Sequence, residues 1–167
     1  SEQLAHLMAN DSDGFNRWDA AQKLGFALLE KLTEDSLQQR PLVMDKQLVD
    51  AYDSLLSDPS LDPAMVDLML QLPSEAQLHE EADIIHVDAI HAARKFVRKS
   101  LAESLSDKFL AVYQRHNIEQ QYVPEAGQIG RRALKNVALS YLMLVDNFGV
   151  ELAWKQFQDA DNMTDKA

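Results

Sequence analysis

Cysteine is absent from this sequence of 167 residues. A disulfide framework and thiolate metal sites are therefore excluded, and we expect a reducing compartment, the cytoplasm. Glycine and proline are scarce, at five each, and nearly all lie between periodic segments, which favours helices joined by short loops. No apolar run approaches the roughly 20 residues of a membrane span, and no charged-then-apolar leader stands out, so we expect no membrane partner.

Basic residues are few relative to acidic ones. The chain carries 16 Lys and Arg against 27 Asp and Glu, a formal net charge of -11. Such a surface repels a phosphate backbone, and no basic helix stands out, so we expect no nucleic-acid partner. Hydrophobic residues make up 46% of the chain. That share argues against disorder, and a chain of this length can bury about 70% of its unfolded surface.

Apolar residues recur every three or four positions along most of the chain, without the alternation of a half-buried strand. This pattern predicts an all-α fold in which seven or eight helices pack as α-hairpins into an irregular α-α superhelix. We expect one helical domain over residues 1–167, and we expect Gly149 to end the helix that begins near residue 125. The predicted helices span residues 2–9, 13–33, 42–56, 62–72, a short segment from 74, 88–116, 125–146 and 150–160.

The helix expected from Asp13 to Thr33 opens on the most recognisable run in the sequence. Asp13 suits the N-cap, where its carboxylate accepts from a free backbone N–H. Arg17 lies four residues after Asp13, and Lys23 four after Asp19, the favourable order for ion pairs along a helix. The apolar residues of this segment predict one buried stripe. That stripe consists of Phe15, Trp18, Ala21, Gly25, Leu28 and Leu32.

Histidines between residues 79 and 91 raise the question of a metal site. The run that starts at His79 begins like the H-E-x-x-H helix of zinc peptidases, but Asp83 occupies the position of the second imidazole. His86 and His91 are about 140° apart around a helix and cannot share one ion from the same face. Solvated carboxylates are the favoured interpretation, and a site built from a loop stays open as the alternative. Its further ligands would be Glu80, Glu81 and Asp83.

No pattern for nucleophilic catalysis is present: there is no Gly-x-Ser-x-Gly and no cysteine. Gly127 and Gly130 form a fragment of a glycine pattern without a preceding strand, so the segment reads as a helix start with Arg131 and Arg132 on its solvent side. The acidic pairs considered for acid/base work are Glu80 with Glu81 and Asp11 with Asp13. Such pairs are usually solvated. We therefore predict no catalytic, cofactor-binding or metal-binding residue in this chain.

Two tryptophans and several methionines have the chemistry of an adaptable apolar groove for a partner. At helical spacing, however, such residues more commonly belong to the core, which is the favoured interpretation. Arg17, next to the first tryptophan, is expected to play a structural role at the start of its helix. The groove candidates are Trp18, Trp154, Met65, Met69 and Met143.

Five short motifs occur in a recognisable order. They are Phe15-Asn16-Arg17-Trp18-Asp19-Ala20-Ala21-Gln22, Asp62-Pro63-Ala64, Leu72-Pro73-Ser74-Glu75, Arg132-Ala133-Leu134-Lys135-Asn136 and Asn162-Met163-Thr164-Asp165. Together they resemble the first half of the C-terminal helical domain in the bacterial aminopeptidase N branch of the gluzincin metallopeptidases. The resemblance covers essentially the whole chain.

The resemblance implies a parent enzyme that uses zinc to remove N-terminal residues from peptides. In that family a Gly-x-Met-Glu-Asn segment and an H-E-x-x-H helix lie upstream, and neither occurs here. The family's helical domain closes over the catalytic site. This chain is thus expected to be helical scaffold and lid, inactive alone and without its own zinc, whose partners are the other domains of its parent and, through them, peptide substrates.

The start at Ser1 and a cap-like Thr164 just before the end suggest a piece excised from a longer chain. The alternative is a free-standing helical module that binds a peptide or protein in an exposed apolar groove. An apolar patch left by missing neighbours is expected near the chain ends, at Met163 and on the face that carries Leu4 and Leu7.

Overall fold

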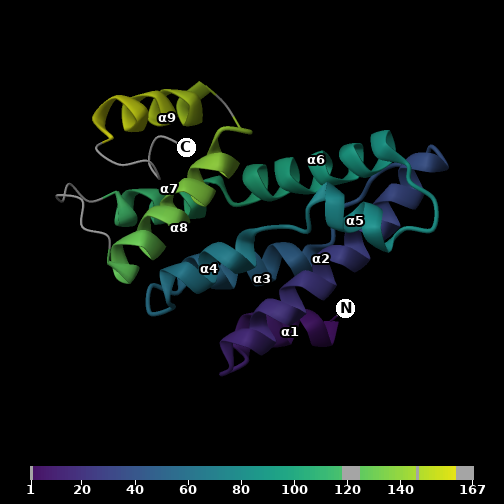
Figure 1. The fold of residues 1–167 in the computed structure, drawn as a ribbon, viewed down its shortest axis with the longest axis horizontal. Helices are drawn as coiled ribbons and strands as arrows, with labels where there is room; N and C mark the ends of the chain where they lie inside the picture. Colours follow the sequence, from purple (N-terminus) through teal and green to yellow (C-terminus); the bar gives the residue numbers. More distant parts are fainter. Residues whose placement is uncertain (1, 118–124, 146, 161–167) are drawn as a thin grey trace.

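The computed structural model describes residues 2–117, 125–145 and 147–160. Within these ranges the chain forms nine α-helices and no strand (Figure 1), which confirms the all-α prediction. None of these helices is both long enough and apolar enough to cross a membrane. The helices are α1 (Glu2–Asn10), α2 (Gly14–Leu37), α3 (Lys46–Ser57), α4 (Pro63–Leu70), α5 (Glu75–Glu81), α6 (Val87–Ser104), α7 (Ser106–His116), α8 (Ala126–Leu142) and α9 (Asn147–Asp159).

The helix predicted over residues 88–116 is in fact two helices, α6 and α7, which meet at Leu105. This residue has φ -123° and ψ 22°, outside the helical range, while its side chain is buried. The break lets α6 pack on α2 while α7 packs on α3 and α8. No glycine or proline lies at the break between α6 and α7. We attribute the break to the different packing partners of the two helices.

Several predicted boundaries are wrong by a few residues. α3 begins at Lys46, capped by Asp45, rather than near residue 42. α4 ends at Leu70 rather than Leu72. α8 ends at Leu142, and Gly149 lies inside α9 instead of ending α8.

The polar turn predicted at residues 34–36 is part of α2, which continues to Leu37. Asp35 is buried there, and its carboxylate accepts from Lys31 Nζ at 3.1 Å and from Arg40 Nε at 2.7 Å. These charges remove the cost of burying the carboxylate inside the last turn. The helix then ends through Gln39, whose φ of 55° lies in the left-handed region. The hydrogen bond from Arg40, followed by the one from Lys31, lowers the pKa of Asp35 below its ordinary value.

We expect this cluster to make stability depend on acidity. Because the folded pKa of Asp35 is lowered, its contribution is present above about pH 4 and is lost as the pH falls through the folded pKa. Asp35→Asn should therefore lower the melting temperature at pH 7 and bring a smaller change at pH 3. Asp50→Asn, which removes an exposed partner of Lys46, is the matched control. An equal loss for Asp35→Asn at both pH values would contradict the assignment.

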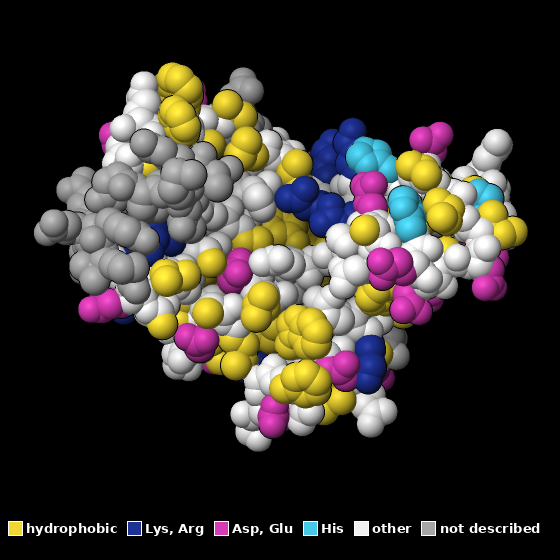
Figure 2. All heavy atoms as spheres, in the orientation of Figure 1, with side chains coloured by type: hydrophobic (Ala, Val, Ile, Leu, Met, Phe, Trp, Pro, Cys, Tyr) yellow, Lys and Arg dark blue, Asp and Glu magenta, His cyan; other side chains and the backbone are white. Residues whose placement is uncertain are grey.

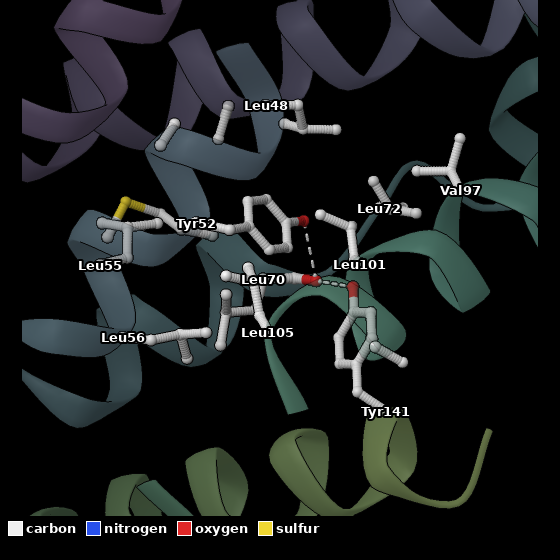
Figure 3. Packing of buried hydrophobic residues seen from close by; sticks show 14 of the residues in the cluster. Leu48, Tyr52, Leu55, Leu56, Leu70, Leu72, Val97, Leu101, Leu105 and Tyr141 are labelled. Carbon is white, nitrogen blue, oxygen red and sulfur yellow. Dashed lines mark hydrogen bonds between the residues drawn. The ribbon is translucent and has the colours of Figure 1, made fainter. Parts of the chain in front are cut away.

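The core is organised around the backbone carbonyl of Leu70, at the last turn of α4. Such carbonyls have no partner within their helix. Tyr52 of α3 and Tyr141 of α8 both donate their hydroxyls to this oxygen, at 3.1 and 2.6 Å (Figure 3). Burial raises the pKa of both tyrosines, so the hydroxyls stay protonated as donors. Phe109 of α7 stacks on Tyr141 with ring centroids 4.5 Å apart. Three helices, α3, α4 and α8, thus meet at one oxygen atom, and α7 packs on them through Phe109.

The contact between α4 and α8 depends on Gly130. A Cβ at this position would lie 3.1 Å from the Ala64 Cβ and 3.2 Å from its backbone nitrogen, closer than packing normally allows. The glycine therefore serves the approach of two helices. The helix-start interpretation of this segment holds, but only Arg131 lies on the solvent side, whereas Arg132 is buried.

Candidate functional site

At the start of α2, the buried and exposed side chains are not those that the apolar stripe predicts. Phe15 is 69% exposed and Trp18 is 36% exposed, and their rings contact each other with centroids 5.9 Å apart. The buried face of the first turns carries Arg17, Ala20 and Ala21 instead. The prediction that Phe15 and Trp18 belong to the core is therefore wrong.

Arg17 has the structural role that the sequence suggests, but its partners are backbone carbonyls rather than the Asp13 carboxylate. Its Nε donates to the Met8 carbonyl at 2.9 Å and a terminal nitrogen donates to the Ala9 carbonyl at 3.0 Å. The side chain thereby binds the carbonyl end of α1, where a cation is favoured. Among the described contacts it forms no ion pair with Asp13, whose carboxylate caps α2 as predicted.

The histidine-rich stretch does not assemble a metal site in the part of the chain that the structure describes. No group of three or more His, Asp and Glu side chains there is arranged to hold an ion. His91 instead points its Nδ1 at the Glu75 carboxylate, 2.8 Å away, and so links α6 to α5.

The groove candidates behave unequally. Met69 is a core residue, 1% exposed, as the favoured interpretation predicts. Trp154 is 62% exposed and stacks on Phe157, while Met143 is 45% exposed. The prediction of burial is therefore wrong for Trp154 and Met143.

A basic groove lies beside α6, and we define it by its lining. It encloses about 260 Å³ and is lined by Glu75, His91, Arg94, Lys95, Arg98 and Leu144. Figure 2 shows Lys, Arg and His side chains gathered over α6, next to a hollow with hydrophobic walls. Three permanent cations face a single carboxylate, and that carboxylate already pairs with His91.

The arginines of the basic groove are held in place by uncharged groups. Arg94 Nε donates to the Pro73 carbonyl at 3.0 Å. The Arg98 guanidinium lies over the Tyr141 ring, 5.4 Å from its centroid, with a long contact of 3.4 Å to Ser140 Oγ. Neither arginine has a carboxylate partner within the described residues. Their charge is therefore positioned but not neutralised.

The sequence contained a signal for this groove that was missed. Positions 91, 94, 95 and 98 lie one turn apart and share one face of a helix. The prediction that the chain has no basic helix is thus wrong for α6, although the whole chain is acidic. The walls supplied by Glu75 and Leu144 come from distant segments, and spacing along α6 does not reveal them.

A second hollow, of about 210 Å³, lies between α2, α5 and α6. Its lining is mostly apolar and includes three glutamates. This hollow is lined by Phe26, Glu30, Thr33, Glu34, Leu37, Leu78, Glu81, Ala82 and Ile90.

The apolar patch that the sequence predicts near the chain ends is not found at Leu4 and Leu7, which pack against the core. Met163 lies outside the described residues.

A known protein family matches the whole length of the chain. The family described as "Domain of unknown function (DUF3458_C) ARM repeats" matches residues 1–167. Aminopeptidase N of Escherichia coli (strain K12) is 35% identical over 165 residues, which cover 98% of this chain and 19% of that protein. Aminopeptidase N of Haemophilus influenzae is 34% identical over 165 residues, which cover 99% of this chain and 19% of that protein.

A solved structure is also similar. Legionella pneumophila aminopeptidase A, in complex with aspartic acid, superimposes with a TM-score of 0.83 at 31% identity, over 99% of this chain and 20% of that one. The chain thus spans about a fifth of the length of the relatives it matches. The region it matches in aminopeptidase N is the helical C-terminal part.

Proposed function

Since this chain belongs to the DUF3458_C family of ARM-repeat domains, we propose that it is one part of an aminopeptidase that removes N-terminal residues from peptides. In this proposal the chain supplies helical scaffold and lid, and the reacting groups lie elsewhere in the parent. The observation that carries the proposal is the match to aminopeptidase N over 98% of this chain but only 19% of that protein.

The exposed apolar side chains support a role beside other domains. Phe15 and Trp18 at the start of α2, and Trp154 and Phe157 on α9, form ring pairs at the surface. Contacting apolar groups of this size commonly mark interaction surfaces. Neighbouring domains of the parent are the partners that the proposal assigns to them.

Zinc belongs to the parent in this proposal. The described residues do not fit a zinc site, since they bring together no group of three His, Asp or Glu ligands. No step of the chemistry is therefore assigned to residues of this chain. The lack of cysteine fits a cytoplasmic parent.

Comparison of the full-length protein from the source gene with the 167-residue chain tests the proposal. We expect the full-length protein to release alanine or leucine from chromogenic aminoacyl anilides and to lose this activity with a zinc chelator. The isolated chain should show no turnover and bind no stoichiometric zinc by elemental analysis. Turnover by the isolated chain, or an inactive full-length protein over a broad panel of aminoacyl substrates, would contradict it.

A free-standing interaction module is the second candidate, and the hollow between α2, α5 and α6 is the feature that favours it. The matches to proteins about five times as long favour the first proposal. A source gene that starts just before Ser1 and stops after Ala167 would decide for the module.

A further inference from the structure

We propose that the basic groove beside α6 binds a peptide carboxylate. The inference rests on the proposed function for the identity of the ligand, since an enzyme that shortens peptides from the N-terminus meets chains that end in a carboxylate. The inference that the groove binds an anion is independent of that function, since it rests on the positions of Arg94, Lys95 and Arg98.

Charge is the first argument. The chain as a whole is strongly acidic, at -11, yet the groove presents three cations without a described carboxylate partner. Elsewhere in the described chain, several exposed lysines pair with nearby acids, as Lys23 does with Asp19 and Lys46 with Asp50. An unneutralised cluster in an acidic surface concentrates the local potential and attracts an anion.

Preorganisation is the second argument. Arg94 is held by the Pro73 carbonyl and Arg98 by the Tyr141 ring, so both guanidiniums lose little freedom when an anion binds. A guanidinium presents planar donors that match the two oxygens of a carboxylate. Lys95 is exposed and has no described partner, so its ammonium is available to complete the site.

The shape of the groove is the third argument. A volume of about 260 Å³ exceeds that of a single small anion, since a water molecule occupies about 30 Å³. Leu144 adds an apolar side chain to the lining of the groove. A lining that combines cations with an apolar side chain suits a peptide residue whose carboxylate and side chain bind together.

Calorimetry on the full-length protein tests the groove. The probes are one N-acetylated peptide, which offers no free amine, with either a C-terminal carboxylate or a C-terminal amide. A third probe, amidated with glutamate as its last residue, separates an end carboxylate from a side-chain carboxylate. We expect the wild type to bind one of the two carboxylate probes about tenfold more tightly than the amide, as charge-assisted hydrogen bonds would give.

Variants assign the effect to the groove. Lys95→Gln should weaken that preference about threefold to tenfold, because it removes one exposed charge-assisted contact. Arg98→Gln should weaken it as well. Lys99→Gln is the matched control, since Lys99 lies beside Arg98 but pairs with Glu103. It should leave the preference unchanged. Circular dichroism verifies that each variant remains folded.

Two outcomes would overturn the inference: equal affinity for acid and amide probes in the wild type, or an equal loss in Lys95→Gln and Lys99→Gln. Turnover of aminoacyl substrates is measured on the same preparations. If the protein is an active peptidase without the carboxylate preference, the proposed function stands and the groove proposal is wrong. If the protein is inactive but shows a carboxylate preference that Lys95→Gln removes, the groove proposal stands and the proposed function is wrong.

Discussion

Replacing Phe109 by alanine is expected to lower the free energy of unfolding by about 3–5 kcal/mol, the usual cost of emptying a buried phenylalanine site. Phe109 has no exposed surface, and its ring stacks on Tyr141. The cavity would also release Tyr141 from the position in which its hydroxyl reaches the Leu70 carbonyl. Urea unfolding of the chain, followed by circular dichroism, measures the loss.

Phe15→Ala is the control for this experiment. Phe15 is 69% exposed, so its removal from the isolated chain should change stability by no more than about 0.5 kcal/mol. A similar loss for both variants would contradict a core centred on the stacked rings. A further comparison uses Tyr141→Phe, which keeps the ring and removes only the hydrogen bond; it should cost about 1–2 kcal/mol.

Replacing Arg17 by methionine is expected to cost about 2–3 kcal/mol, because two charge-assisted hydrogen bonds to backbone carbonyls are lost. Methionine keeps most of the apolar stem, so the effect reports on the guanidinium. The loss should be concentrated at α1, whose last carbonyls, Met8 and Ala9, would remain without these donors. Urea unfolding gives the magnitude, and hydrogen exchange of the α1 amides gives the location.

Lys23→Met provides the comparison, since it removes a cation of the same helix that is exposed and pairs only with Asp19. Exposed pairs of this kind contribute about 0–1 kcal/mol. If Arg17→Met costs no more than Lys23→Met, or if the exchange of α1 amides is unchanged, the assignment of Arg17 to the end of α1 is wrong.

Three helix starts, those of α2, α4 and α5, agree with the prediction, because in each the capping partners lie within one turn. The Asp13 carboxylate accepts from the Phe15 and Asn16 amides, and Asp62 with Pro63 begins α4. Ser74 and Gln77 form the predicted capping box, with hydrogen bonds of 3.2 and 2.9 Å. These contacts need only a local chain geometry that the residue types themselves favour.

Features that depend on distant segments were predicted badly. The break at Leu105 has no local marker, and α2 continues through Asp35 because Arg40 folds back onto its carboxylate. Trp18 fits the apolar period of α2, yet the described helices leave it 36% exposed. Periodicity shows which residues share a face, but it does not show how much of that face another helix covers.

The sequence by itself determined the helical class, the N-caps at Asp13, Asp62 and Ser74, and the common face of the α6 cations, because each follows from spacings within one element. Only the tertiary structure decided that Tyr52 and Tyr141 meet at the Leu70 carbonyl and that Phe109 stacks on Tyr141. It also decided that Glu75 and Leu144 close a groove around those cations. These contacts join residues tens of positions apart, and the packing of many side chains at once selects among such arrangements.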